Sequence, residues 1–170
     1  HKEVAERTQR IPSIPQVYQP FGAVPEAQEW LQLFQHDALR YPLLLVHAPS
    51  RAGKTEWAES LFKNPLKLLV GSLEQFPEKA RQLDRRVHDG LVLDDVRDMQ
   101  FLSDNQEKLQ GKYSSTVELG TTPSGQHAFH LDLFRLPVVV TVNNTTANLH
   151  YLHSHDFLGK RANVRLLSFQ

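Results

Sequence analysis

The chain has 170 residues, a size typical of one globular domain with an apolar core. Its 19 basic and 19 acidic residues give a formal net charge of zero, so any binding of a polyanion must come from a local patch. The sequence contains no cysteine, which excludes disulfides and thiolate metal sites.

No apolar run is long enough to span a bilayer, so no membrane partner is expected. The first residues lead into no apolar segment and show no signal peptide. Because the chain starts with His1 rather than Met, we expect an excised fragment of a longer protein or a processed product. Residues 1–24 contain three prolines and little periodicity, which predicts a linker or oligomerisation arm before a domain spanning residues 25–170.

Hydrophobic spacing predicts helices that alternate with strands. Apolar residues three or four positions apart favour helices at residues 26–39, 56–62, 73–87 (starting near Pro77) and 99–109. Mainly apolar stretches that favour strands lie at residues 43–46, 66–70, 91–93, 137–142 and 164–167, and the run at residues 43–46 is continuous, as in a strand buried on both faces. A hairpin is expected from residues 114–119 and 128–133 around a turn at residues 121–125. This order predicts a three-layer α/β fold with a central, mainly parallel sheet.

The most informative motif joins the strand at residues 43–46 to the helix at residues 56–62. A buried strand, a tight loop ending in Gly-Lys-Thr and a helix predict a phosphate-binding loop, since the loop amides and helix N-terminus favour an anion. The alternative is a glycine-containing turn with a solvated lysine. The predicted nucleotide-binding residues are Pro49, Ser50, Arg51, Ala52, Gly53, Lys54, Thr55 and Glu56.

Within this loop, Lys54 is expected to reach the β- and γ-phosphates and Thr55 to bind Mg²⁺. Ala48 stands where the usual motif has its first glycine, a position that accepts alanine when its φ is negative.

Polar residues follow two of the predicted strands. Asp94 and Asp95 end the run at residues 91–93, and in open α/β sheets ligands bind at the carboxyl ends of strands. We expect Asp94 to join Thr55 in the Mg²⁺ shell and Asp95 to orient the attacking water; the alternative is a solvated acidic turn. Asn143 ends the run at residues 137–142 and is predicted to contact the γ-phosphate, in preference to Asn144, although a simple turn would also use these residues.

Three further residues are candidates for contacts with other molecules. Arg161 is predicted to supply a cation to a neighbouring subunit's site, against the alternative of a basic surface turn. Lys112 precedes the hairpin and His127 lies past its tip, and both are predicted to contact DNA, against the alternative of an exposed polar hairpin. The histidines between residues 127 and 155 match no metal-ligand spacing, so scattered surface histidines are expected rather than a zinc site.

Together these motifs resemble the superfamily-three helicase domain of replication-initiator (Rep) proteins from small circular single-stranded DNA viruses, such as geminiviruses and circoviruses. Residues 48–55 resemble Walker A, residues 91–95 Walker B, residues 111–119 the B′ region and residues 138–145 motif C. The resemblance covers roughly residues 43–165. Two departures are Ala48 and the absence of the Lys-Gly-Gly common in B′.

The resemblance implies an AAA+-like P-loop NTPase that hydrolyses ATP with Mg²⁺ as a DNA helicase. It also implies a hexameric ring around single-stranded DNA, and a place in the host nucleus. Family members carry an N-terminal nuclease domain, whose metal motif and nucleophilic tyrosine are not found in this chain, so nicking and joining are not expected of it. Two alternatives remain: a P-loop small-molecule kinase, and a nucleotide-binding assembly module without turnover, for which Ala48 is the sole hint.

Overall fold

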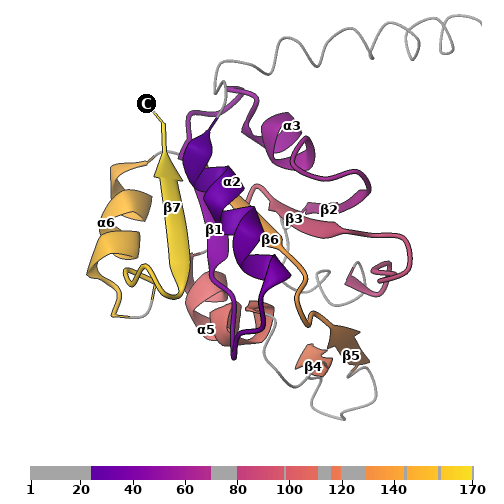
Figure 1. Cartoon of the computed structure of the whole chain (residues 1–170). Helices are drawn as coiled ribbons and strands as arrows, with labels where there is room; N and C mark the ends of the chain where they lie inside the picture. The colour runs from indigo at the N-terminus through magenta and orange to yellow at the C-terminus, as the bar shows by residue number, and fades with distance from the viewer. Residues whose placement is uncertain are drawn as a thin grey trace, which may run out of the picture.

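A computed structural model describes residues 24–69, 80–97, 99–110, 116–119, 129–143, 145–156 and 158–169. Its centre is a five-stranded, all-parallel sheet with the strand order β2-β3-β6-β1-β7 (Figure 1). The strands are β1 Leu43–Ala48, β2 Pro65–Leu69, β3 Gly90–Asp94, β6 Val138–Asn143 and β7 Val164–Ser168. The predicted α/β class with a parallel sheet is therefore confirmed.

The middle strands are leucine and valine runs because both of their faces are covered. Every residue of β1 is buried, and so are the first five residues of β6. Strand β6 lies between β1 and β3, pairing Val139 with Leu44 on one side and with Val92 on the other. The carboxyl ends of β1, β6 and β3 consequently lie next to each other.

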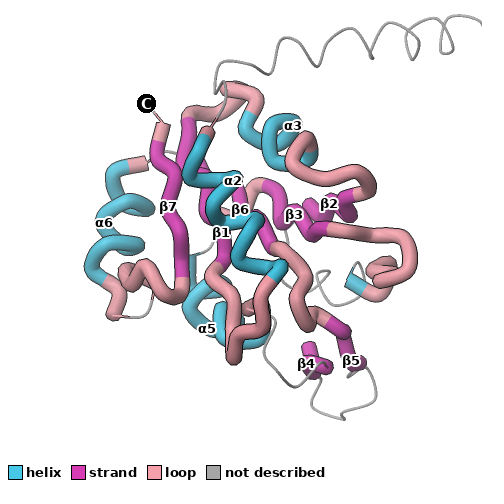
Figure 2. The backbone as a smooth tube through the Cα atoms, viewed as in Figure 1, coloured by secondary structure: helices cyan, strands magenta, loops and turns pink. Residues whose placement is uncertain are grey.

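Helices cover both faces of the sheet (Figure 2). On one face, α2 Pro25–Gln32 and α3 Lys54–Glu59 pack through Trp30 and Trp57 against Leu44 and Val46. On the other face, α5 Met99–Leu109 and α6 Thr146–Ser154 share a core with the alternate residues of β1. The result is the expected three-layer arrangement. No helix in the described ranges is long and apolar enough to cross a membrane.

Two predicted helices are shorter than expected. The α-helix predicted for residues 26–39 ends at Gln32 and continues only as the 3-10 turn η2 Leu33–Gln35. The helix predicted at residues 56–62 starts two residues earlier, at Lys54, and ends at Glu59. The earlier start follows from Gly53, whose left-handed backbone (φ 86°) forms the N-cap.

The predicted helix at residues 73–87 was wrong in its described part. Ala80 is helical, but the chain then runs in turns to Asp89. Asp84 explains this, because its backbone N–H binds the His88 ring and its carboxylate binds the Arg86 N–H and side chain. Such local bonds compete with a helix. Residues 70–79, including Pro77, lie outside the described part.

Helix α6 was not predicted, and a turn at residues 143–146 was only the alternative to a γ-phosphate contact by Asn143. The Thr145 hydroxyl caps α6 by accepting a hydrogen bond from the Asn148 N–H, 3.1 Å away. The hairpin is confirmed: β4 Thr116–Leu119 pairs antiparallel with β5 Phe129–Asp132. Its predicted turn at residues 121–125 is outside the described residues.

Candidate phosphate and metal site

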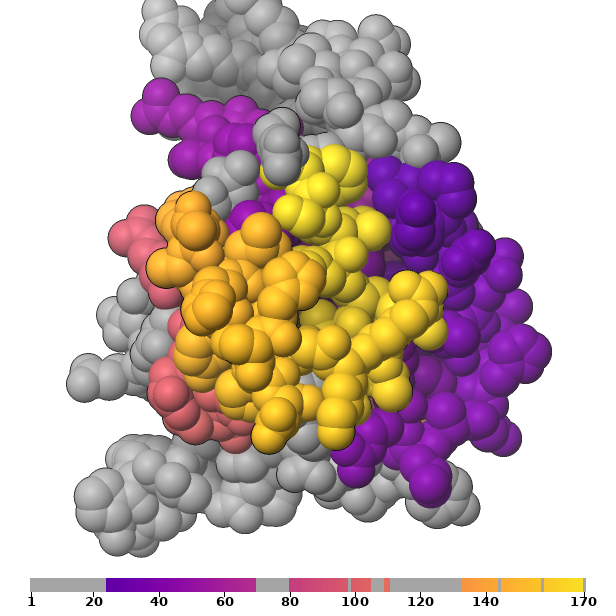
Figure 3. Space-filling view, turned by 90° about the vertical axis from the view of Figure 1, so that its left-hand side faces the viewer, coloured from indigo at the N-terminus to yellow at the C-terminus, as the bar shows by residue number. Residues whose placement is uncertain are grey.

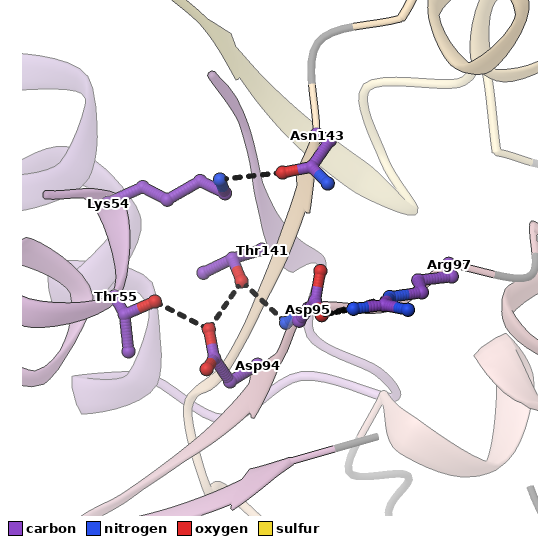
Figure 4. Close-up of polar contacts among 7 residues, drawn as sticks. All are labelled: Lys54, Thr55, Asp94, Asp95, Arg97, Thr141 and Asn143. Atoms are coloured by element: carbon purple, nitrogen blue, oxygen red, sulfur yellow. Dashed lines mark hydrogen bonds and ion pairs between the residues drawn. The ribbon is translucent and has the colours of Figure 1, made fainter. Parts of the chain in front are cut away.

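The carboxyl ends of β1, β6 and β3 form the edge of the sheet where ligands bind in open α/β proteins. Ala48 and Asn143 are register partners there, and Asp94 ends the next strand. The loop after β1 and the two strand ends therefore face a common space (Figure 4). A cavity of about 230 Å³ at this edge is lined by Ser50, Arg51, Lys54, Thr55, Leu69, Asp94, Asp95, Arg97 and Asn143.

The loop between β1 and α3 is a tight turn with two left-handed residues. Arg51 has φ 61° and Gly53 has φ 86°, a conformation that is uncommon for any residue but glycine. The Ala52 N–H bonds the Pro49 carbonyl at 3.3 Å, closing the turn. Position 48 does not require glycine, because Ala48 is the last residue of β1 and has an extended backbone. The departure at this position is thus compatible with the loop.

Lys54 is the first residue of α3, directly after the loop, and its side chain is largely shielded from solvent. Its residue is 7% exposed, and its ammonium donates to the Asn143 side-chain oxygen at 3.0 Å and to the Pro49 carbonyl at 3.2 Å. Burial lowers the pKa of Lys54 below its usual value, and the nearby Asp94, Asp95 and Glu56 only partly oppose this. A buried cation held by two uncharged oxygens is suited to receive an anionic ligand.

Thr55 and Asp94 form the part of the site that suits a metal. The Thr55 hydroxyl donates to Asp94 Oδ1 at 2.5 Å, so its own oxygen lone pairs remain for a cation. Among the described residues no cluster of three His, Cys, Asp or Glu could hold a metal alone. Mg²⁺ does not need one, since it is commonly bound by one or two carboxylates together with phosphate oxygens and water. The donor set here fits Mg²⁺ delivered with a phosphate ligand.

Asp95 lines the same cavity but is engaged by Arg97. The Arg97 guanidinium bonds Asp95 Oδ2 from two nitrogens, at 2.9 and 3.0 Å. Asp95 also has a left-handed backbone, with φ 57°. To orient a water, this carboxylate would have to release Arg97, whose side chain is 76% exposed and therefore able to move away.

Arg161 lies near the amino ends of the strands, at the opposite end of the sheet from Lys54 and Asp94. It precedes β7, whose first residue, Val164, pairs with Leu43 at the start of β1. A second cavity of about 240 Å³ lies beside it, on the side of the molecule that carries α6 and β7 (Figure 3). The structure therefore joins Lys54, Thr55, Asp94, Asp95 and Asn143 but keeps Arg161 apart from them within one chain.

The two predicted DNA contacts and the less favoured γ-phosphate contact fall in parts of the chain that the structure does not describe. Lys112, His127 and Asn144 lie outside the described residues.

Two residues of this region were not singled out from the sequence. Thr141, fully buried in β6, donates its hydroxyl to Asp94 Oδ1 at 2.9 Å and accepts the Asp95 N–H at 2.9 Å. His47, buried in β1, contacts the Ser168 hydroxyl and the Thr145 carbonyl. A signal was present for both, because each places a polar side chain within an otherwise apolar strand.

Comparison with known proteins adds no assignment: no family model matches the chain, and no curated protein sequence matches it.

Proposed function

We propose that this chain is a P-loop, AAA+-like ATPase that serves as the helicase domain of a viral or virus-derived replication initiator. One observation carries the proposal. Lys54, Thr55 and the ends of two other strands, Asp94 and Asn143, come together in a single cavity through hydrogen bonds of 2.5 to 3.0 Å. These residues are separated by up to 89 positions in the chain, so their meeting is not a consequence of a local motif.

The roles follow from the donors and acceptors present. A triphosphate in the loop would accept hydrogen bonds from the loop amides and from Lys54, which would exchange Asn143 or Pro49 for a phosphate oxygen. The Thr55 hydroxyl and Asp94 would hold Mg²⁺, which when bound neutralises charge that develops on the phosphates.

Hydrolysis also needs a positioned water. Asp95, once released from Arg97, would accept its proton, and the Asn143 amide would hydrogen-bond the γ-phosphate. The last element is an added cation in the transition state. Arg161 is too far away to supply it within the same chain, because it precedes β7, whose first and last residues alone lie about 13 Å apart.

Arg161 is therefore proposed to act on a neighbouring subunit's nucleotide. A contact that joins two different surfaces of identical subunits produces a ring when its rotation closes, which agrees with the proposed hexamer. Single-stranded DNA would pass through its pore beside the β4–β5 hairpin, a two-stranded sheet separate from the central one. Lys112 and His127, which flank the hairpin strands in sequence, are the proposed contacts.

The test is Mg²⁺-dependent ATP hydrolysis measured against protein concentration, with and without single-stranded DNA. Lys54→Ala is the inactive variant, and Lys63→Ala, at an exposed lysine, is its matched control. We expect turnover that rises steeply with concentration, increases with DNA and is lost only in Lys54→Ala. Binding without turnover in a demonstrated oligomer would overturn the motor and favour the assembly module. Turnover that requires a small acceptor molecule would indicate the kinase.

A further inference from the structure

Thr141 is the one hydroxyl in a strand of valines. Its neighbours in β6 are Val138, Val139, Val140 and Val142, and Thr141 itself has no solvent exposure. A buried hydroxyl is unfavourable unless it is hydrogen-bonded, and valine has the same shape. Packing alone would therefore be served at least as well by valine at this position.

The hydroxyl is instead used twice. It donates to Asp94 Oδ1 at 2.9 Å and accepts the backbone N–H of Asp95 at 2.9 Å (Figure 4). The Thr141 carbonyl accepts the next amide, Val96 N–H, at 3.0 Å. One residue of β6 thus binds three consecutive residues at the end of β3.

These bonds have a consequence for each acidic residue. Asp94 Oδ1 receives two hydroxyl donors, Thr141 and Thr55, so its orientation is set from both sides. Asp95 adopts a left-handed backbone, which few residues other than glycine, asparagine and aspartate adopt, and its amide is fixed by Thr141 in that conformation. Because threonine is branched at Cβ, few rotamers are open to its hydroxyl.

We propose that Thr141 is a positioning residue that orients Asp94 toward the metal and holds Asp95 in the turn from which it reaches the water. This role rests on the proposed ATPase function. It assigns to Thr141 no contact with nucleotide or metal.

The variants that test the role are Thr141→Val, which keeps the shape and removes the hydroxyl, and Thr141→Ser, which keeps the hydroxyl. We expect Thr141→Val to bind nucleotide normally in EDTA. The Mg²⁺ concentration for half-maximal turnover should rise about 10-fold or more and kcat should fall, as is usual when a residue supporting a metal ligand is lost. Thr141→Ser should restore both values to within a few-fold of the parent.

A second measurement does not depend on activity. Amide hydrogen exchange in the free protein should be faster at Asp95 in Thr141→Val and near the parent rate in Thr141→Ser. If the valine variant does not fold, Thr141→Cys, with a weaker donor, is measured in the same way.

The outcomes separate the two proposals. If the parent protein hydrolyses ATP, and Thr141→Val has the same Mg²⁺ dependence and the same amide exchange at Asp95, the role of Thr141 is overturned and the proposed function stands. A parent protein that binds no nucleotide overturns the proposed function and this role with it.

Discussion

The ammonium of Lys54 donates a hydrogen bond to the side-chain oxygen of Asn143 across a distance of 3.0 Å. Lys54 begins the helix that follows β1, and Asn143 ends the neighbouring strand β6, so the bond joins the loop to the sheet edge. Asn143 is itself fixed, because its backbone carbonyl accepts the Asn148 side-chain amide at 3.1 Å. In the proposed ATPase, this hydrogen bond is the one that the γ-phosphate of a bound triphosphate would replace.

Asn143→Ala should lower kcat about 100-fold while changing the KM for ATP only a few-fold. In the proposed mechanism, the side-chain NH₂ of Asn143 donates to the γ-phosphate and acts mainly on charge that develops in the transition state. Steady-state kinetics at saturating Mg²⁺ measure both values. Asn64→Ala, at an exposed asparagine next to the other end of the sheet, is the control and should leave them unchanged. A rise in KM with unchanged kcat would show that Asn143 contributes to binding rather than to the chemical step.

Arg161→Ala should reduce turnover about 1,000-fold without loss of nucleotide binding, since arginines of this kind act on the transition state. If Arg161 serves the neighbouring subunit, mixing Arg161→Ala with Lys54→Ala should restore part of the activity. At some interfaces, an Arg161→Ala subunit then supplies an intact Lys54 and its Lys54→Ala neighbour supplies an intact Arg161. Arg86→Ala, at an exposed arginine paired with Asp84, is the matched control. Full activity of Arg161→Ala alone would exclude the proposed shared site.

The stability of the protein should depend on pH through Lys54. Its pKa is lowered by burial, so below the usual value of 10.5 there is a window in which folded Lys54 has lost its proton and unfolded Lys54 still holds one. Unfolding then takes up a proton, and the free energy of unfolding rises with pH. Urea unfolding at several alkaline pH values should show this gain in the parent relative to Lys54→Met. Parallel pH curves for the two proteins would contradict it.

Gly90→Ala should destabilise the fold without affecting the site. A Cβ at Gly90 would lie 2.5 Å from ring carbons of Phe62, and overpacking of this kind usually costs about 1–3 kcal/mol. Gly90 starts β3, at the far end of the strand from Asp94, so nucleotide affinity should be kept. Urea midpoints of Gly90→Ala, Phe62→Leu and the double variant test the cause, because the smaller side chain should relieve the clash. An unchanged midpoint in Gly90→Ala would show that Phe62 moves aside freely.

The five parallel strands and Met99–Leu109 could be predicted because their signals are local. A mainly apolar stretch of about five residues is sufficient to predict a strand, and a spacing of three and four residues to predict a helix face. Predictions were poorest where side chains bond the nearby backbone. Asp84 breaks the expected helix after Ala80, and Thr145 begins a helix where none was predicted.

The sequence by itself determined the strand–loop–helix unit around Lys54 and the polar residues that end the strands, since these depend on neighbours a few positions apart. Only the tertiary structure decided that β6 lies between β1 and β3, and this order places Asn143 against Lys54 and Thr141 against Asp94. It also decided that Arg161 lies at the amino ends of the strands, away from Lys54. The physical reason is that strand order depends on pairing and burial between segments far apart in the chain, which no local pattern of residues records.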